Sequence, residues 1–343
     1  MRAFGFEAHG GLERARVLDL PVPEPGPGEV RLTMTAAGLN HLDLFTLEGL
    51  EGVSIPLPHV LAGDGTGRVE ANGPGAARFQ PGEPVLIDPS LSDGTCEYCL
   101  RGLECFCRNY RILGEHVQGV ASELAVIPER NLVPLPPRLD PVEGAGVALV
   151  FMTAYRALST VGRLSAGDQL AIIGAGGGLS TAAVQLGRER GARVVVASRS
   201  AAKLERVRAL GADDVLPLGQ GEPLDRGLWR LSGKKGFDVI YDCTGRETFA
   251  LSARALARGG RLVFSGATTG PQVSLDLRPL FWRGVSLCGS TMATRHEFSE
   301  VLALLAEGKV HPVVDRVYPL AEAPRALARL SGGEGFGKVL LRM

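Results

Sequence analysis

The chain has 343 residues, enough for about two domains, and 45% of them are hydrophobic, as in globular proteins. The 37 Lys and Arg balance the 37 Asp and Glu, which argues against nucleic acid or an anionic membrane surface as the main partner. No apolar run approaches the length of about 18 residues that a membrane span requires, and residues 1–7 lack a signal-peptide core. We therefore expect a cytoplasmic protein.

The first part of the chain, to about residue 150, consists of short apolar segments separated by Gly and Pro. Examples are residues 30–37, 67–71 and 84–87. Short strands broken by turn residues are typical of an all-β module. The sequence therefore predicts a β-rich domain in this half.

Four of the six cysteines fall within twelve residues, at Cys96, Cys99, Cys105 and Cys107. In a cytoplasmic chain, such a cluster favours a metal site over disulfides. Thiolates at positions i and i+3 wrap a tetrahedral zinc ion, and Cys96 and Cys99 form such a pair. We predict one structural zinc, held by Asp93, Cys96, Cys99 and Cys107, with Cys105 as the competing fourth ligand. Free thiols or a redox pair are the alternatives.

From residue 152 to 290, buried-looking strand segments alternate with amphipathic helix segments. This alternation predicts an α/β fold with a doubly wound parallel sheet. At 170–180 an apolar strand runs into a glycine-rich turn and then into a helix, where N–H groups face a bound pyrophosphate. The expected cofactor contacts of this turn are Gly174, Gly176, Gly177, Gly178 and Leu179.

Residues after the second strand of this domain indicate the choice of cofactor. A site for NAD(H) commonly places Asp or Glu about 20 residues beyond the glycine turn, where it binds the ribose hydroxyls. That position is Ser198 here, followed by Arg199 and, on the next helix, Lys203. A small hydroxyl and two cations suit a 2′-phosphate, so we predict NADP(H) over NAD(H). Gly245 and Gly266 follow later strands and are expected to border the cofactor.

The order of these features resembles the medium-chain dehydrogenase/reductase family, which includes zinc alcohol dehydrogenases and zinc-free quinone oxidoreductases. Residues 38–43 resemble the family's first active-site segment, and residues 61–67 resemble its second. Residues 152–158 resemble the helix that enters the cofactor domain. Residues 192–197, 242–245, 259–262 and 336–339 continue the match.

The resemblance implies two domains. Residues 1–151 and 291–343 would form a GroES-like, β-rich catalytic domain with a zinc lobe near residues 93–107. Residues 152–290 would form a Rossmann dinucleotide-binding domain. The resemblance also implies a homodimer or homotetramer.

The resemblance further implies that this chain differs from the family's zinc alcohol dehydrogenases in its metal content. The family's catalytic zinc is carried by a Cys, a His and a third Cys or Asp, often with a Glu beside the His. These positions hold Asn40, Gly63 and Leu149 here, and Asp64 stands in the Glu position. Glycine and leucine have no ligand atom, so we expect the catalytic zinc to be missing. The less favoured alternative is a displaced metal site of His41, Asp43, His59 and Asp64.

Without a metal, hydrogen-bond donors must stabilise the oxygen that gains charge. Asn40 is the first candidate donor, and Asp43 and Tyr155 are candidates for positioning or proton relay. A neutral donor favours an acceptor that delocalises charge, so we expect NAD(P)H-dependent reduction of a quinone or an α,β-unsaturated carbonyl. One alternative is an alcohol dehydrogenase that interconverts alcohols with aldehydes or ketones. The other is a non-catalytic, NADPH-binding redox sensor that uses Cys105 and Cys107.

Overall fold

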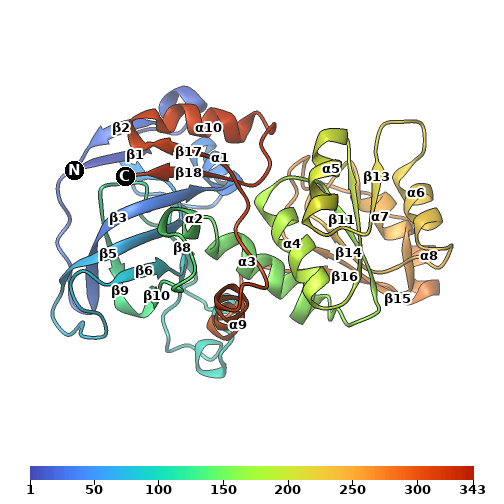
Figure 1. The fold of residues 1–343 in the computed structure, drawn as a ribbon, viewed down its shortest axis with the longest axis horizontal. Helices are drawn as coiled ribbons and strands as arrows, with labels where there is room; N and C mark the ends of the chain where they lie inside the picture. The colour runs from blue at the N-terminus through green and yellow to red at the C-terminus, as the bar shows by residue number, and fades with distance from the viewer. The chain divides into compact units, whose positions relative to one another are not determined.

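The structure is a computed structural model that describes all 343 residues. It divides into two compact units (Figure 1). The β-rich unit consists of Met1–Leu149 and Thr294–Met343, and the parallel-sheet unit consists of Val150–Ala293. None of the helices combines the length and the apolar character that a membrane crossing needs. The α/β class expected from the sequence is confirmed.

The β-rich unit is built on a seven-stranded sheet in the order β10-β6-β5-β3-β18-β17, in which β9 also pairs with β3. A three-stranded sheet (β2-β1-β4) and a two-stranded sheet (β7-β8) complete it. The strands are β1 (Arg2–Phe6), β2 (Arg16–Asp19), β3 (Glu29–Leu39), β4 (His59–Val60), β5 (Asp64–Asn72), β6 (Pro84–Ile87), β7 (Ser90–Leu91), β8 (Arg111–Ile112), β9 (Leu124–Pro128), β10 (Leu132–Pro134), β17 (Val314–Pro319) and β18 (Lys338–Arg342). The helices are α1 (His41–Glu48), α2 (Pro141–Gly144), α9 (Arg295–Ala306) and α10 (Ala323–Ser331).

The C-terminal strand β18 lies between β3 and β17, although more than 290 residues separate it from β3 in the sequence. In Figure 1 the red strand β18 runs beside the blue strand β3. The register pairs Val339 of β18 with Leu39 of β3, and Gly38 of β3 with Asp64 of β5. This pairing brings residues 338, 40 and 64 to the same end of the sheet.

The parallel-sheet unit contains six strands in the order β13-β12-β11-β14-β15-β16, and every pair is parallel. This is the order 3-2-1-4-5-6 of a doubly wound dinucleotide-binding fold. The strands are β11 (Gln169–Ile173), β12 (Arg193–Ser198), β13 (Asp214–Pro217), β14 (Phe237–Asp242), β15 (Leu256–Phe264) and β16 (Ser286–Gly289). The helices are α4 (Gly178–Glu189), α5 (Ala201–Leu210), α6 (Leu224–Leu231), α7 (Phe249–Arg254) and α8 (Leu277–Arg283), and α3 (Ala148–Tyr155) leads into the unit through a π-helical turn at Arg156–Val161.

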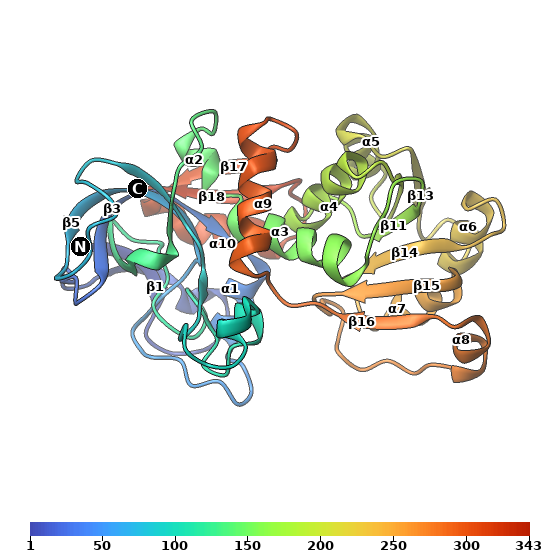
Figure 2. The ribbon, with the colours of Figure 1, turned by 90° about the horizontal axis from the view of Figure 1, so that it is seen from below.

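The central strands of the parallel sheet are buried along nearly their whole length. Val194–Ala197 of β12 and Leu170–Ile173 of β11 are all buried, because helices cover both faces of the sheet. Figure 2 shows β14, β15 and β16 side by side and pointing in the same direction. The sheet therefore presents its functional groups at strand ends rather than on its faces.

Candidate functional site

The junction between β3 and α1 places Asn40 in a buried polar network. β3 ends at Leu39, Asn40 is the extended N-cap residue of α1, and α1 begins at His41. The amide Nδ2 of Asn40 donates to the carbonyl oxygen of Gly38 at 3.2 Å and to Oδ2 of Asp64 at 3.0 Å. Both amide hydrogens are therefore used within the protein. The donor that we expected from the sequence is already engaged.

Asp64, the first residue of β5, is fully buried and uses both carboxylate oxygens. Its Oδ1 accepts the backbone N–H of Leu149 at 2.7 Å. Its Oδ2 accepts Asn40 and also the ammonium of Lys338, whose Nζ lies 2.9 Å away. A buried carboxylate is costly without a partner of opposite charge, and Lys338 supplies that partner.

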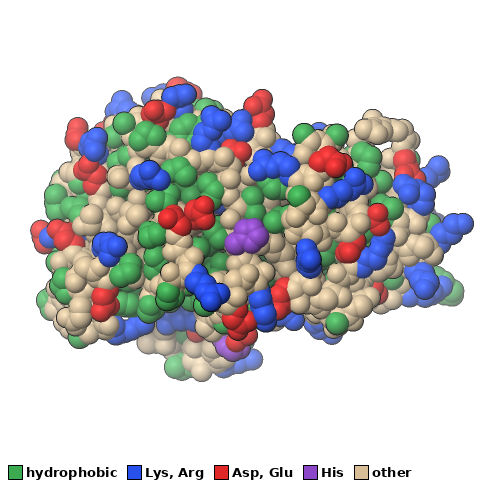
Figure 3. All heavy atoms as spheres, in the orientation of Figure 1, with side chains coloured by type: hydrophobic (Ala, Val, Ile, Leu, Met, Phe, Trp, Pro, Cys, Tyr) green, Lys and Arg blue, Asp and Glu red, His purple; other side chains and the backbone are tan.

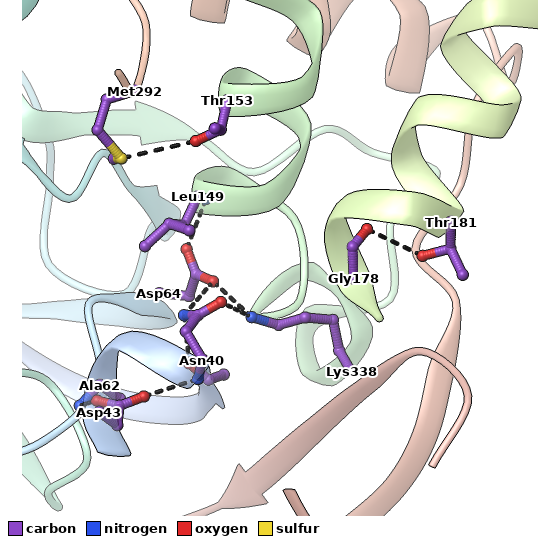
Figure 4. Close-up of polar contacts among 11 residues, drawn as sticks. Asn40, Asp43, Ala62, Asp64, Leu149, Thr153, Gly178, Thr181, Met292 and Lys338 are labelled. Carbon is purple, nitrogen blue, oxygen red and sulfur yellow. Dashed lines mark hydrogen bonds and ion pairs between the residues drawn. The ribbon is translucent and has the colours of Figure 1, made fainter. Parts of the chain in front are cut away.

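Lys338 is a candidate functional residue that the sequence analysis did not single out. It opens β18, is only 4% exposed, and also donates to Oδ1 of Asn40. Figure 4 shows the side chains of Asn40, Asp64 and Lys338 converging on one point. One signal was present in the sequence: Lys338 is one of only five lysines beside 32 arginines, and three apolar residues follow it directly in the strand.

The residues at the expected metal position do not fit a zinc ion. A Cβ atom on Gly63 would lie 2.6 Å from the carbonyl oxygen of Leu113, so no histidine has room there. Leu149 offers no ligand atom, and the carboxylate of Asp64 is ion-paired with the ammonium of Lys338. The ammonium of Lys338 would in addition repel a second cation. The donor set agrees with the expectation that this site does not bind zinc.

The displaced metal site is not assembled either. The only group of metal-binding side chains in the structure lies in the cysteine lobe. His59 is fully buried with its ring beside Phe6 at 5.4 Å, and this burial lowers its pKa. His41 begins α1 and is exposed.

Asp43 fixes the backbone around the network. Its Oδ2 accepts the N–H of Asn40 and its Oδ1 accepts the N–H of Ala62, each at 2.7 Å. Ala62 has a positive φ of 68°, and the hydrogen bond from its N–H helps to hold this unfavourable conformation. Burial raises the pKa of Asp43 to about 6, although the two N–H donors and Lys338 act against the shift. The geometry gives Asp43 a positioning role.

Tyr155, the third catalytic candidate, lies in the parallel-sheet unit at the end of α3. Its hydroxyl accepts a hydrogen bond from Nη2 of Arg190 at 3.1 Å. The guanidinium of Arg190 also lies over the tyrosine ring, 5.2 Å from its centre. These contacts explain Tyr155 as a packing and hydrogen-bonding partner of Arg190.

The glycine-rich turn between β11 and α4 has the geometry that a phosphate requires. Gly174 and Gly176 have φ values of 99° and 90°, which favour glycine. Gly177 precedes α4, and a Cβ there would meet no protein atom within 4 Å. No side chain caps α4, so the N–H groups of Gly178 and Leu179 remain available to an anion. These residues fit a dinucleotide pyrophosphate.

The remaining cofactor candidates lie at the carboxyl ends of β12, β14 and β15. Ser198 ends β12, and Arg199 forms an exposed ion pair with Glu247 at 3.7 Å. Lys203 lies in the first turn of α5, where its N–H donates to the hydroxyl of Ser200. A Cβ on Gly245 would lie 2.7 Å from the carbonyl oxygen of Gly270, whereas a Cβ on Gly266 would have no neighbouring atom closer than 3.7 Å. Close packing therefore explains why residue 245 is a glycine, but it does not explain the glycine at position 266.

The net charge of zero conceals opposite charges on the two units. Residues 150–293 contain 19 of the 37 basic residues but only 11 of the 37 acidic residues. Figure 3 shows the basic side chains exposed on the molecular surface among acidic ones. The excess of positive charge in the parallel-sheet unit suits a cofactor that carries several phosphate charges.

The cysteine lobe gathers Asp93, Cys96, Cys99 and Cys107, whose ligand atoms lie within 4.8 Å of one another. The Sγ atoms of Cys96 and Cys99 are 3.6 Å apart, close to the spacing of about 3.8 Å that tetrahedral bonds of about 2.3 Å give. Cys105 is buried and does not belong to this group. The lobe therefore fits a structural zinc ion with Asp93 as the fourth ligand.

Hydrogen bonds shape the lobe around Asp93. Its Oδ1 accepts the N–H of Cys96 and the N–H of Thr95, and these bonds hold its pKa well below the usual range. The Sγ of Cys107 accepts the backbone N–H groups of Asp93 and Asn109 at 3.3 and 3.4 Å. N–H donors of this kind stabilise thiolate and carboxylate ligands.

The parallel sheet, its glycine turn and the β-rich unit of the same chain define a dinucleotide-dependent oxidoreductase with two domains. Residues 26–137 match the family model described as "Alcohol dehydrogenase GroES-like domain", and residues 178–307 match the model described as "Zinc-binding dehydrogenase". The chain belongs to the zinc-type alcohol dehydrogenase-like family of medium-chain dehydrogenases/reductases, as the sequence motifs indicated.

Relatives in this family carry two kinds of name. The chain is 31% identical over 341 residues to an "NAD-dependent alcohol dehydrogenase" of Sulfolobus acidocaldarius, covering 96% of this chain and 97% of the relative. It is also 31% identical over 344 residues to an "Acryloyl-coenzyme A reductase" of Metallosphaera sedula, covering 99% of each.

Solved structures show the same fold over the whole chain. A structure described as an NAD-dependent alcohol dehydrogenase has a TM-score of 0.95 and 42% identity, with both chains fully covered. A thermostable alcohol dehydrogenase from Pyrobaculum aerophilum, described as binding cobalt and zinc, has a TM-score of 0.90 and 35% identity, covering 100% of this chain and 99% of the other.

Proposed function

We propose that this oxidoreductase reduces an α,β-unsaturated carbonyl compound or a quinone with NAD(P)H. The observation that carries the proposal is the network of Asn40, Asp64 and Lys338, which stands where a catalytic metal would need its ligands. The bound dihydronicotinamide supplies a hydride. An acceptor that spreads the incoming charge over a conjugated system needs no Lewis acid, whereas an alkoxide gains much from one.

The names of the relatives support two acceptor classes. The Metallosphaera sedula relative is named for reduction of acryloyl-coenzyme A, an unsaturated thioester, which agrees with the proposal. The alcohol dehydrogenase names favour a second candidate, the interconversion of an alcohol with an aldehyde or ketone. The polar network supports the first candidate, because it contains the ammonium of Lys338 where the resemblance would place metal ligands.

The test is a panel of substrates assayed with the purified enzyme whose metal content is known. We expect turnover of unsaturated ketones, unsaturated thioesters or quinones at least 100-fold above that of saturated ketones and primary or secondary alcohols. We also expect one zinc per chain. Faster turnover of alcohols, dependent on a second zinc, would establish the alcohol dehydrogenase candidate instead.

We propose NADP(H) as the preferred cofactor, on the basis of Ser198, Arg199 and Lys203. The residue at the end of β12 is Ser198 rather than an Asp or Glu. Arg199 is exposed and its ion pair with Glu247 is weak, so its guanidinium is available to a 2′-phosphate. The printed names of relatives as NAD-dependent favour NAD(H), so kinetics with both cofactors must decide. We propose that Gly174, Gly176, Gly177, Gly178 and Leu179 hold the pyrophosphate and that Gly245 and Gly266 border the cofactor.

We also propose that the protein is a homo-oligomer. The strand β16 is an edge strand that pairs only with β15. The adjacent helix α8 exposes Leu277, Phe281 and Trp282, at 65%, 70% and 74%. An unpaired edge beside large exposed apolar side chains favours association with a second copy of the chain.

A further inference from the structure

Two segments of the parallel-sheet unit flank its glycine-rich turn. β11 lies between β12 and β14, and its last residue, Ile173, pairs with Ala197 of β12 and with Asp242 of β14. The segments that follow β12 and β14 therefore leave the sheet on either side of the turn, at the edge where such folds bind a dinucleotide. The N–H of Gly174 donates to the carbonyl oxygen of Ala197 at 2.8 Å, which ties the turn to the end of β12.

Arg199 and Glu247 join these two segments. Nη1 of Arg199, the residue directly after β12, lies 3.7 Å from Oε2 of Glu247, which follows β14. Among residues 198–203 and 243–247, Glu247 is the only acidic residue, whereas Arg199, Lys203 and Arg246 are basic. The one carboxylate of the two segments is thus paired with the arginine that we assign to a 2′-phosphate.

Hydrogen bonds hold the loop that carries Glu247. Its backbone N–H donates to Oγ1 of Thr269 at 3.2 Å. Oδ1 of Asp242 accepts the N–H of Thr244 and the hydroxyl of Thr248, each at 2.9 Å, so the loop is fixed on both sides of Glu247. None of these bonds uses the carboxylate of Glu247. A substitution that removes only this charge therefore leaves the loop in place.

We propose that Glu247 competes with the 2′-phosphate of NADP(H) for Arg199 and thereby sets the cofactor selectivity of this protein. The inference deepens the proposed cofactor preference and rests on it. NAD(H) has a hydroxyl group at the 2′ position and leaves the ion pair intact. NADP(H) brings a phosphate with a charge of about −2, which draws Arg199 away from Glu247 and repels the carboxylate.

Glu247 therefore acts against the attraction that Arg199 offers to a 2′-phosphate. An ion pair between exposed side chains is weak, and these two side chains are 77% and 55% exposed, so one anion can replace the other without a change of fold. Because the competition costs NADP(H) binding energy but leaves NAD(H) unaffected, the preference for NADP(H) is smaller than Arg199 alone would give.

The experiment measures the binding of two cofactor fragments, 2′,5′-ADP and 5′-AMP, to the full-length protein by isothermal titration calorimetry. Glu247→Gln should lower the dissociation constant for 2′,5′-ADP by about threefold to fivefold, as expected for an exposed ion pair. It should change the dissociation constant for 5′-AMP by less than twofold. The control is Glu205→Gln, which removes an exposed carboxylate paired with Arg208 on α5 and should change neither constant by more than twofold.

Arg199→Ala tests whether the competition passes through the arginine. In the Arg199→Ala background, Glu247→Gln should improve the binding of 2′,5′-ADP by less than twofold, because the two anions no longer share a cation. The gain of the single variant Glu247→Gln should also shrink when the salt concentration rises from about 0.05 M to about 0.5 M, since exposed charges are screened.

An unchanged dissociation constant for 2′,5′-ADP in Glu247→Gln would overturn the inference, and so would an equal gain with and without Arg199. If the wild type in that case binds 2′,5′-ADP at least tenfold more tightly than 5′-AMP, the proposed NADP(H) preference stands although the inference fails. If the wild type binds both fragments equally and Glu247→Gln gains affinity for 2′,5′-ADP alone, the inference stands and the proposed preference fails.

Discussion

The Nζ atom of Lys338 lies 2.9 Å from Oδ2 of Asp64, and the two residues are separated by 274 positions in the sequence. Both side chains are buried, and Asn40 bridges them. The pair joins the C-terminal strand β18 to the start of β5, on either side of β3. The network therefore links the last segment of the chain to the candidate active site.

We predict that the buried charges of Lys338 and Asp64 stabilise the fold only when both are present. Replacing one member of a buried ion pair leaves the other uncompensated, which costs about 3–5 kcal/mol. Lys338→Met and Asp64→Leu should each lower the free energy of unfolding of the β-rich unit by this amount. The double variant should lose much less than the sum of the two.

Urea denaturation of the four proteins in this cycle measures the coupling. Lys309→Met, which removes a lysine that is paired with Glu307 at the surface, should change stability by less than 1 kcal/mol. Additive losses in the double variant would show that Lys338 and Asp64 do not stabilise each other.

Much of the fold followed from local patterns in the sequence. The alternation of buried strands with helices predicted the parallel sheet, and the glycine turn predicted the helix after it, which is α4. Both signals are local, because hydrophobic period and turn chemistry act over a few residues. The cysteine spacing likewise placed three thiolates and Asp93 in one lobe.

The polar network was harder to predict because it depends on long-range strand pairing. The motif around Asn40 was recognised, but the use of its amide depends on Gly38, Asp64 and Lys338 together. Lys338 lies beside Asn40 and Asp64 only because of the register in which β18 pairs with β3. A lysine at the start of a strand does not reveal its partner until that register is known.

We predict that zinc stabilises the cysteine lobe. The wild type should contain one zinc per chain, and removal of the ion with a chelator should lower Tm. If the ion contributes about 3 kcal/mol, the shift is about 10 °C. Asp93→Ala should lose zinc, whereas Cys105→Ser should keep it, because Cys105 is outside the ligand group. Full zinc content in Asp93→Ala together with zinc loss in Cys105→Ser would reverse the ligand assignment.

We predict that the cofactor preference depends on Arg199. The wild type should show a kcat/KM at least tenfold higher with NADPH than with NADH. Arg199→Ala should lower kcat/KM for NADPH by about 10-fold to 150-fold, since a charge-assisted bond to phosphate contributes about 1.5–3 kcal/mol, and should leave NADH nearly unchanged. Arg206→Ala, on the same helix as Lys203, is the control. Equal use of both cofactors by the wild type would remove the basis for the NADP(H) assignment.

We predict that α8 takes part in self-association. Phe281→Glu combined with Trp282→Glu should convert the oligomer to a smaller species, because both side chains are more than two-thirds exposed in the single chain. Trp229→Glu, at a less exposed tryptophan on α6, is the matched control. Light scattering measures the mass of each species. A wild-type protein that is already a monomer would refute this prediction.

Glu115 gives a prediction for the pH dependence of stability. Burial raises its pKa from 4.5 to about 7, and no hydrogen bond or charge acts against the shift. The nearest cationic group is Nδ1 of His116 at 3.7 Å, and burial and Arg111 lower the pKa of that histidine. The folded protein must therefore bury an unfavourable negative charge once Glu115 ionises.

The raised pKa of Glu115 in the folded state means that stability falls as the pH rises. Below pH 4.5 the carboxyl is protonated in both folded and unfolded chains, so it costs nothing. As the pH rises to 7 and above, the unfolded chain ionises more easily, and about 3 kcal/mol of stability is lost. Glu115→Gln should remove this loss, so the variant should be more stable than the wild type at pH 8 and similar at pH 4. Urea denaturation across this range measures the difference, with the exposed Glu51→Gln as control. A constant difference at all pH values would mean that Glu115 acts through packing rather than through its charge.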